Sequence, residues 1–188
     1  PLLDTHAHLN SDVFRGDLPE VLERAARAGV VKVIDVGTDR NTSARAGENS
    51  RSHPSVFAAV GIHPHEASRA GVHDLTALEK RLDDPRVVAL GEIGLDFHYD
   101  FSPREDQIPL FGRQLVLARA RNLPVIVHNR EAGKDVLDIL RDRLPPSGGV
   151  LHCYSEDAEY ARRVLDEDLN LYFSFAGNLT YRNARNLH

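Results

Sequence analysis

The chain has 188 residues, 41% of them hydrophobic and 27% charged, which is typical of one globular domain. Its formal net charge of −5 argues against a broad basic surface for nucleic acid, although bound metal could supply positive charge to a nuclease. No apolar run reaches the roughly 20 residues of a membrane span, no secretory signal is visible, and the single cysteine, Cys153, cannot form an internal disulfide. We therefore expect one domain over residues 1–188, without membrane association, in the reducing cytoplasm.

Short apolar runs alternate with amphipathic segments along the chain. The runs have the length and the flanking Gly, Pro, Asp and Asn residues of β-strands, and they predict strands at residues 2–9, 30–36, 56–62, 87–93, 123–128, 149–153 and 169–175. Between them, apolar residues at helical spacing predict helices, most clearly at residues 18–28, 110–120, 136–144 and 158–165.

The alternation of strands and helices predicts an α/β fold with a parallel sheet that is covered on both faces. No GxGxxG motif follows the first strand, which weakens the dinucleotide-binding form of an open sheet. Polar, ligand-type residues follow several strands at their C-terminal ends, where barrel active sites form. We therefore expect a TIM-type (β/α)8 barrel. Such a barrel needs eight strands and about 250 residues, so we expect it to be truncated after the seventh strand.

The first strand carries two histidines on one face. Side chains alternate along a strand, so Asp4, His6 and His8 point the same way. Two imidazoles at this spacing can chelate one metal ion, and neutral imidazole suits zinc, manganese or iron. A pair of surface histidines is the alternative, but it is less typical at the end of a buried strand. We predict that His6 and His8 bind metal and that Asp4 supports them.

The fourth strand ends in two carboxylates. Glu92 follows the apolar residues 87–90, and a buried carboxylate without a partner is costly. A cation would offset this cost, and one carboxylate can bridge two metals; an arginine partner is the alternative. We predict Glu92 as a metal ligand and catalytic residue, and Asp96 as a supporting residue or loop anchor.

Two further histidines end apolar strands. His128 terminates the fifth strand and His152 the sixth. Either histidine alone would more often be a core residue, but together they repeat the pattern of the first strand. We predict both as metal ligands with a catalytic role. The ligands of all these strands could then hold two divalent cations roughly 3.5–4 Å apart.

Other side chains near these strand ends suit a substrate. We predict that His63, in the segment GIHPH, donates to a phosphate oxygen, and that His65 supports the ligands. Arg130 could clamp a phosphate with its planar guanidinium, and a surface salt bridge is the alternative. Three aromatic residues between positions 97 and 101 could stack unpaired bases or could pack over the barrel rim.

Six ordered blocks resemble the TatD family of metal-dependent deoxyribonucleases, part of the amidohydrolase-like TIM-barrel superfamily. The blocks are DTHAHL, GIHPH, GEIGLDFHYD, LPVIVHNREA, LHCYS and YFSFAGNLT, and they extend from Leu3 to about residue 183. The resemblance implies that His6 and His8 bind one metal, that Glu92 bridges, and that His128 and His152 bind the second. The family also carries an aspartate ligand on the eighth strand, and this chain ends before that block.

The resemblance further implies a function: hydrolysis of phosphodiester bonds in DNA by two-metal activation of water. It implies a 3′–5′ exonuclease on single-stranded DNA or ends, with a part in DNA repair, supported by Mg²⁺, Mn²⁺ or Zn²⁺. We expect a monomer whose partner is the nucleic acid substrate.

Two other functions stay open. The first is a D-aminoacyl-tRNA deacylase or another metallohydrolase on the same barrel. Many such relatives bridge their metals with a carbamylated lysine from the fourth strand; Glu92 occupies that position here, and no lysine ends a strand, which weighs against an amidase. The second is an inactive, truncated metal-binding fragment, which the missing eighth strand favours.

Overall fold

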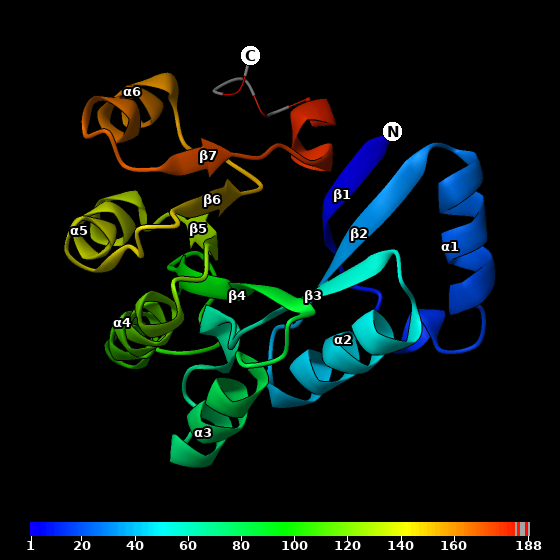
Figure 1. Ribbon diagram of the computed structural model, residues 1–188. Coiled ribbons are helices and arrows are strands. Elements are labelled where there is room, and N and C mark those ends of the chain that lie inside the picture. Colours follow the sequence, from blue (N-terminus) through cyan, green and yellow to red (C-terminus); the bar gives the residue numbers. More distant parts are fainter. Residues whose placement is uncertain (183, 185–186, 188) are drawn as a thin grey trace. The chain divides into compact units, whose positions relative to one another are not determined.

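The computed structural model describes residues 1–182, 184 and 187 (Figure 1). Contacts within the chain divide it into two compact units. Unit 1 contains Pro1–Ile62 and Gly71–Glu92, and unit 2 contains His63–Ala70 and Ile93–His188. The boundary between the units lies inside the fourth strand, directly after Glu92. The prediction of one domain stays a prediction.

All seven predicted strands are present, and their order in the sheet is their order in the chain. They are β1 (Leu2–Ala7), β2 (Val30–Val36), β3 (Val56–Val60), β4 (Val87–Asp96), β5 (Val125–Arg130), β6 (Gly149–His152) and β7 (Leu171–Phe173). β1–β2, β2–β3, β3–β4, β5–β6 and β6–β7 all pair in parallel. The predicted α/β class with parallel strands is therefore confirmed. β4 continues three residues past its predicted end, to Asp96, and the next backbone N–H, of Phe97, donates to the carbonyl of Arg130.

In unit 1, three α-helices follow strands: α1 (Leu18–Arg27), α2 (Arg40–Ser52) and α3 (Val72–Arg81). α1 lies along β2, and α2 lies along β3 (Figure 1). The sequence pattern did not predict α2, because its buried face consists of small residues, among them Ser43 and Ala46, and not of large apolar ones. A capping box between Asp39 and Thr42 starts this helix by satisfying its first backbone donors.

In unit 2, the α-helices are α4 (Arg104–Arg121), α5 (Gly133–Arg143) and α6 (Ala158–Asp166). α4 begins at Arg104, before its predicted start at residue 110, since its first turns are largely polar. Gln107 lies four residues before Phe111, on the same buried face, but its amide hides the apolar pattern. Short 3₁₀ helices occur at Asp12–Phe14, Pro64–Glu66 and Gly177–Thr180.

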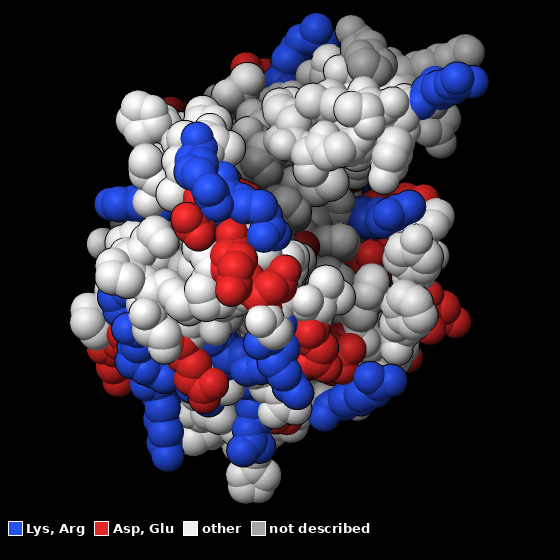
Figure 2. Space-filling model, turned by 90° about the vertical axis from the view of Figure 1, so that its right-hand side faces the viewer, with Lys and Arg blue, Asp and Glu red and all other residues white. Residues whose placement is uncertain are grey.

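The surface carries charges of both signs. On the face drawn in Figure 2, basic and acidic side chains are interspersed and form no continuous basic area among the described residues. This agrees with the net charge of −5. Within the described part of the chain, no helix combines the length and the apolar character that crossing a bilayer requires.

Candidate metal centres

Unit 1 brings three predicted ligands together. The Nε2 atom of His6 lies 3.3 Å from Nε2 of His8 and 3.3 Å from Oε2 of Glu92, and the His8–Glu92 distance is 4.0 Å. Donor atoms 2.0–2.1 Å from a tetrahedral cation lie about 3.4 Å from each other. The spacing therefore fits a shared cation. Because Glu92 is only 5% exposed, its carboxylate needs a positive partner. We call His6, His8 and Glu92 the HxH–Glu set.

The orientation of His8 makes its Nε2 atom the one that can bind a cation. Its Nδ1 atom lies 2.8 Å from the backbone carbonyl of Val36, at the end of β2. A carbonyl only accepts hydrogen bonds, so Nδ1 carries the proton of the neutral ring and Nε2 keeps its lone pair. The Asn10 side chain donates to the same carbonyl at 2.9 Å. Backbone groups of unit 1 thus select the tautomer of His8 that can bind a cation.

Asp4 and Gly61 both lie close to the backbone of the same set. The Asp4 carboxylate accepts from the backbone N–H of His6 at 3.0 Å, so it contacts the chain and not the imidazole. A Cβ atom at Gly61 would lie 2.7 Å from the carbonyl carbon of Gly91, so only glycine lets the end of β3 approach the residue before Glu92. The supporting role of Asp4 stays a prediction.

Unit 2 gathers His63, His65 and His128, each of which offers a ring nitrogen within 4.8 Å of the others. The carboxylate of Asp96, 0% exposed, contacts two of them: its Oδ2 atom is 2.8 Å from Nε2 of His65 and 2.9 Å from Nε2 of His128. Burial by itself raises the pKa of Asp96. Hydrogen bonds from His128, from the backbone of Tyr99 and from His65 outweigh burial and lower this pKa well below its ordinary value. We call the three histidines and Asp96 the His–Asp set.

The hydrogen bonds assign different roles to the three imidazoles. In its neutral form, His128 donates from Nε2 to Asp96, so the lone pair of the ring lies on Nδ1. His63 accepts from the backbone N–H of His65 through Nδ1 at 3.2 Å, so its Nε2 carries a proton and acts as a donor. This geometry supports the predicted ligand role of His128 and the predicted phosphate contact of His63. It disfavours a cation held by all three rings.

Three residues hold the His–Asp set in place, and sequence reasoning missed two of them, Gln107 and Ser102. Gln107 accepts from the backbone N–H of Asp96 at 2.8 Å and donates to its carbonyl at 2.9 Å. Ser102 donates to the carbonyl of His65 at 2.8 Å. Gly94 has φ of +141°, and a Cβ atom there would lie 2.0 Å from the carbonyl oxygen of His128. Of these residues, Gln107 could have been found from the sequence, because it lies at helical spacing from the apolar residue Phe111.

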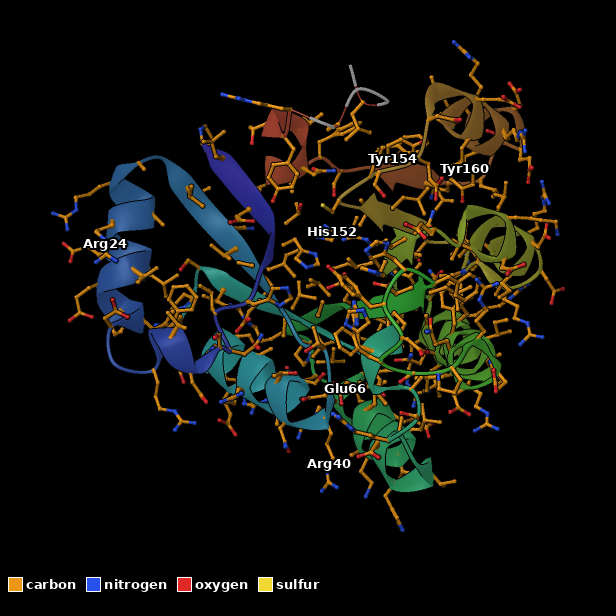
Figure 3. The ribbon with its side chains drawn as sticks, turned by 180° about the vertical axis from the view of Figure 1, so that it is seen from behind. Arg24, Arg40, Glu66, His152, Tyr154 and Tyr160 are labelled. Carbon is orange, nitrogen blue, oxygen red and sulfur yellow. The ribbon has the colours of Figure 1, made fainter. Side chains whose placement is uncertain are left out.

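His152 lies at the end of β6 (Figure 3), where its Cα pairs with that of His128 across the sheet. Its Nδ1 atom is 3.3 Å from the hydroxyl oxygen of Ser174. A cavity of about 350 Å³ opens beside these two strand ends, and its lining includes His128, Arg130, His152, Glu156 and Asn178. The structure thus places the two predicted ligands of β5 and β6 side by side.

Glu156 and two tyrosines lie beyond His152. Burial raises the pKa of Glu156, and the hydrogen bond from Asn129 opposes this shift without cancelling it. Burial also raises the pKa of Tyr154 to about 12, and its ring centroid lies 6.4 Å from that of Tyr160 (Figure 3). Burial raises the pKa of the Tyr160 hydroxyl as well, so both hydroxyls stay protonated near neutral pH.

Arg130 does not form the salt bridge that was the alternative for it. Within the described part of the chain its guanidinium has no carboxylate partner, and its Cζ atom lies 5.0 Å from the ring centroid of Tyr99. The neighbouring Glu131 pairs with His98 at 2.6 Å. The charge of Arg130 is therefore available to an anion.

The parallel sheet carries histidines in or directly after the C-terminal parts of β1, β5 and β6, and a glutamate on β4. Such residues at the carboxyl ends of TIM-barrel strands are typical of metal-dependent hydrolases. Residues 3–188 match the sequence model of the family described as TatD related DNase. The chain therefore belongs to the TatD-related DNase family, as predicted.

Individual relatives agree with this assignment. The chain is 42% identical over 185 residues to the uncharacterized metal-dependent hydrolase YabD of Bacillus subtilis, covering 98% of this chain and 72% of that one. It is 38% identical to the 3′-5′ ssDNA/RNA exonuclease TatD of Edwardsiella piscicida, covering 94% and 68%.

Solved structures confirm the fold class. The crystal structure of YjjV, a TatD homologue from Escherichia coli, superposes with a TM-score of 0.90 at 34% identity, over 96% of this chain and 70% of that one. An uncharacterized amidohydrolase from Saccharomyces cerevisiae shares the fold at 20% identity, with a TM-score of 0.75.

Proposed function

We propose that the protein is a metal-dependent nuclease that hydrolyses phosphodiester bonds of DNA from the 3′ ends of single strands. The observation that carries this proposal is the HxH–Glu set, whose three donor atoms lie at the mutual distances of ligands around one cation. The name of the Edwardsiella relative, a 3′-5′ ssDNA/RNA exonuclease, supports the substrate class.

Two divalent cations, Mg²⁺, Mn²⁺ or Zn²⁺, are proposed. His6, His8 and Glu92 would hold one of them, and His128, through Nδ1, and His152 would hold the other. Such cations supply an activated water and neutralise charge on the attacking and leaving oxygens. The histidine-rich ligand sets favour zinc or manganese by ligand type, whereas Mg²⁺ prefers oxygen ligands.

The protein's own groups would position the phosphate. His63 is oriented as a donor, and it would hydrogen-bond a non-bridging oxygen from Nε2. Arg130 would bind a second oxygen through its planar guanidinium, as arginine does with phosphates. Both contacts would strengthen as negative charge builds on the phosphate oxygens, which is how preorganised donors accelerate a reaction.

The proposed setting is a monomer in the cytoplasm that acts on free DNA ends, with a part in DNA repair. The mixed surface charge supports a short substrate contact, since a protein that follows long duplex DNA needs a continuous basic surface.

The test combines metal analysis with a nuclease assay. Purified protein is expected to bind two equivalents of metal and to shorten a 5′-labelled single strand from its 3′ end, and a chelator is expected to abolish this activity. The double variant His6→Ala/His8→Ala should lose one equivalent of metal and the activity. His73→Ala, an exposed histidine on α3, is the matched control. Metal-loaded protein that leaves DNA intact but hydrolyses D-aminoacyl-tRNA would overturn the proposal.

A further inference from the structure

Two aromatic rings of unit 2 face solvent in a stacked arrangement. Tyr99 is 43% exposed and Phe101 is 62% exposed, in the loop that joins β4 to α4. Their ring centroids lie 5.4 Å apart, and their planes are inclined by only 23°. Exposed aromatic surface is costly in water, and exposed aromatic rings on a loop are a surface on which unpaired bases stack.

The loop holds these rings in fixed positions. The backbone N–H groups of His98 and Tyr99 both donate to Oδ1 of Asp96 at 3.0 Å. The ring of His65 packs edge-on against Phe101, with centroids 4.7 Å apart. Since Asp96 and His65 also belong to the His–Asp set, the same contacts fix the two aromatic rings and the imidazoles. The rings are therefore oriented before a ligand arrives, which lowers the entropic cost of binding.

A positive charge adjoins the exposed rings. The guanidinium of Arg130 lies 5.0 Å from the ring centroid of Tyr99, on the strand that also carries His128. A nucleotide has an apolar base face and an anionic phosphate, and the pair of rings with its neighbouring arginine offers one partner for each. A purely apolar partner would leave this guanidinium without an anion.

We propose that Tyr99 and Phe101 form a stacking platform for an unpaired base of a single-stranded nucleic acid, with Arg130 on the adjoining phosphate. This inference rests on the proposed nuclease function and assigns specific residues to its preference for single strands. A base within a duplex cannot expose its face to the platform, so the platform favours single-stranded ends over blunt duplex ends.

The platform is tested with Tyr99→Ala/Phe101→Ala against the aromatic-retaining Tyr99→Phe/Phe101→Tyr. Tyr172→Ala is the control, because Tyr172 is 72% exposed on β7, outside the platform. The substrates are a ten-nucleotide oligo-dT, the same strand with stable abasic residues at its 3′ end, and a blunt duplex. The alanine variant is expected to raise KM for oligo-dT about 10- to 100-fold while changing kcat about twofold at most. Tyr172→Ala should match the unchanged protein, and the aromatic-retaining variant should keep most of the affinity that the alanine variant loses.

The abasic strand separates stacking from other causes. The unchanged protein should bind the abasic strand about as weakly as the alanine variant binds oligo-dT, and the alanine variant should no longer distinguish the two strands. Equal KM values for all proteins on oligo-dT would overturn the platform. So would an alanine variant whose KM rises as much on the abasic strand as on oligo-dT. Either result would leave the nuclease proposal intact. If the unchanged, metal-loaded protein cleaves none of the three substrates, the nuclease proposal itself fails.

Discussion

The two histidine sets use the same residue types but differ in spacing. In the HxH–Glu set of unit 1, donor atoms lie 3.3–4.0 Å apart, at the distance of ligands around a cation. In the His–Asp set of unit 2, the carboxylate of Asp96 lies 2.8 and 2.9 Å from two ring nitrogens, at hydrogen-bond distance. The residue types in a set therefore do not tell whether its carboxylate binds a cation directly or orients the histidines by hydrogen bonds.

The sets also differ in what selects the histidine tautomer. In unit 1 the backbone carbonyl of Val36 orients His8. In unit 2 a buried carboxylate orients His128 and, at the same time, caps the loop that carries Tyr99. A carboxylate makes a histidine ligand more basic than a carbonyl does. We therefore expect the unit 2 cation to be more sensitive to changes around its ligands.

The largest expected effect comes from Glu92, whose proposed contact with the cation is direct. Glu92→Gln should reduce nuclease activity by more than about 100-fold. This is more than the loss of about 10- to 100-fold that is usual when a residue hydrogen-bonded to a metal ligand is removed. The fold should be retained, because glutamine has nearly the same shape. Steady-state cleavage of single-stranded DNA, together with circular dichroism, measures both. Unchanged hydrolysis at full metal content would contradict the ligand role.

Asp96→Asn should have the next largest effect and should act on unit 2 alone. Loss of the carboxylate frees His128 to adopt the wrong tautomer, so affinity for the unit 2 cation should fall about 10- to 100-fold. Affinity for the unit 1 cation should not change. Calorimetric metal titration measures the two affinities separately. Asp100→Asn, at an exposed position near Asp96, is the control. An equal loss at both cations would remove the distinction between the sets.

Gly94→Ala tests the backbone of the His–Asp set. The new Cβ atom would lie 2.0 Å from the carbonyl oxygen of His128, at a φ of +141° that other residues rarely adopt. The free energy of unfolding should fall by about 1–3 kcal/mol or more, as measured by urea denaturation. Gly177→Ala is the control, because a Cβ atom at Gly177 meets nothing within 4 Å. Equal stability of the two variants would contradict the close approach.

The smallest expected effect concerns Asp84, a carboxylate of unit 1 outside both sets. The backbone N–H of Arg86 lowers its pKa from the ordinary value of 3.8; burial opposes this shift, and Arg51 adds to it. A lowered folded-state pKa contributes stability above pH 3.8 that is lost as pH falls through the folded-state value.

Asp84→Asn should therefore lower the free energy of unfolding by about 0.5 kcal/mol at pH 7 and by less near pH 3. Urea denaturation at the two pH values measures the difference. Metal affinity should not change in either unit. A variant that is destabilised equally at both pH values would show that the charge of Asp84 plays no part.

The sequence by itself determined the strands and the types of residue at their ends. Apolar runs and alternating side chains are local properties, so all seven strands and the positions of His6, His8, Glu92, His128 and His152 could be predicted before the fold was known. Helix α2 and the start of α4 could not, because their buried faces carry small or polar side chains whose burial depends on neighbours elsewhere in the chain.

Only the tertiary structure decided which nitrogen each histidine offers and which residues share a set. Asp96 lies 31 residues from His65 and 32 from His128 along the chain, yet it contacts both. A tautomer depends on the partner of the other ring nitrogen, and the stacking of Tyr99 on Phe101 depends on the loop conformation that Asp96 holds. These contacts join residues far apart in sequence, and no local pattern specifies them.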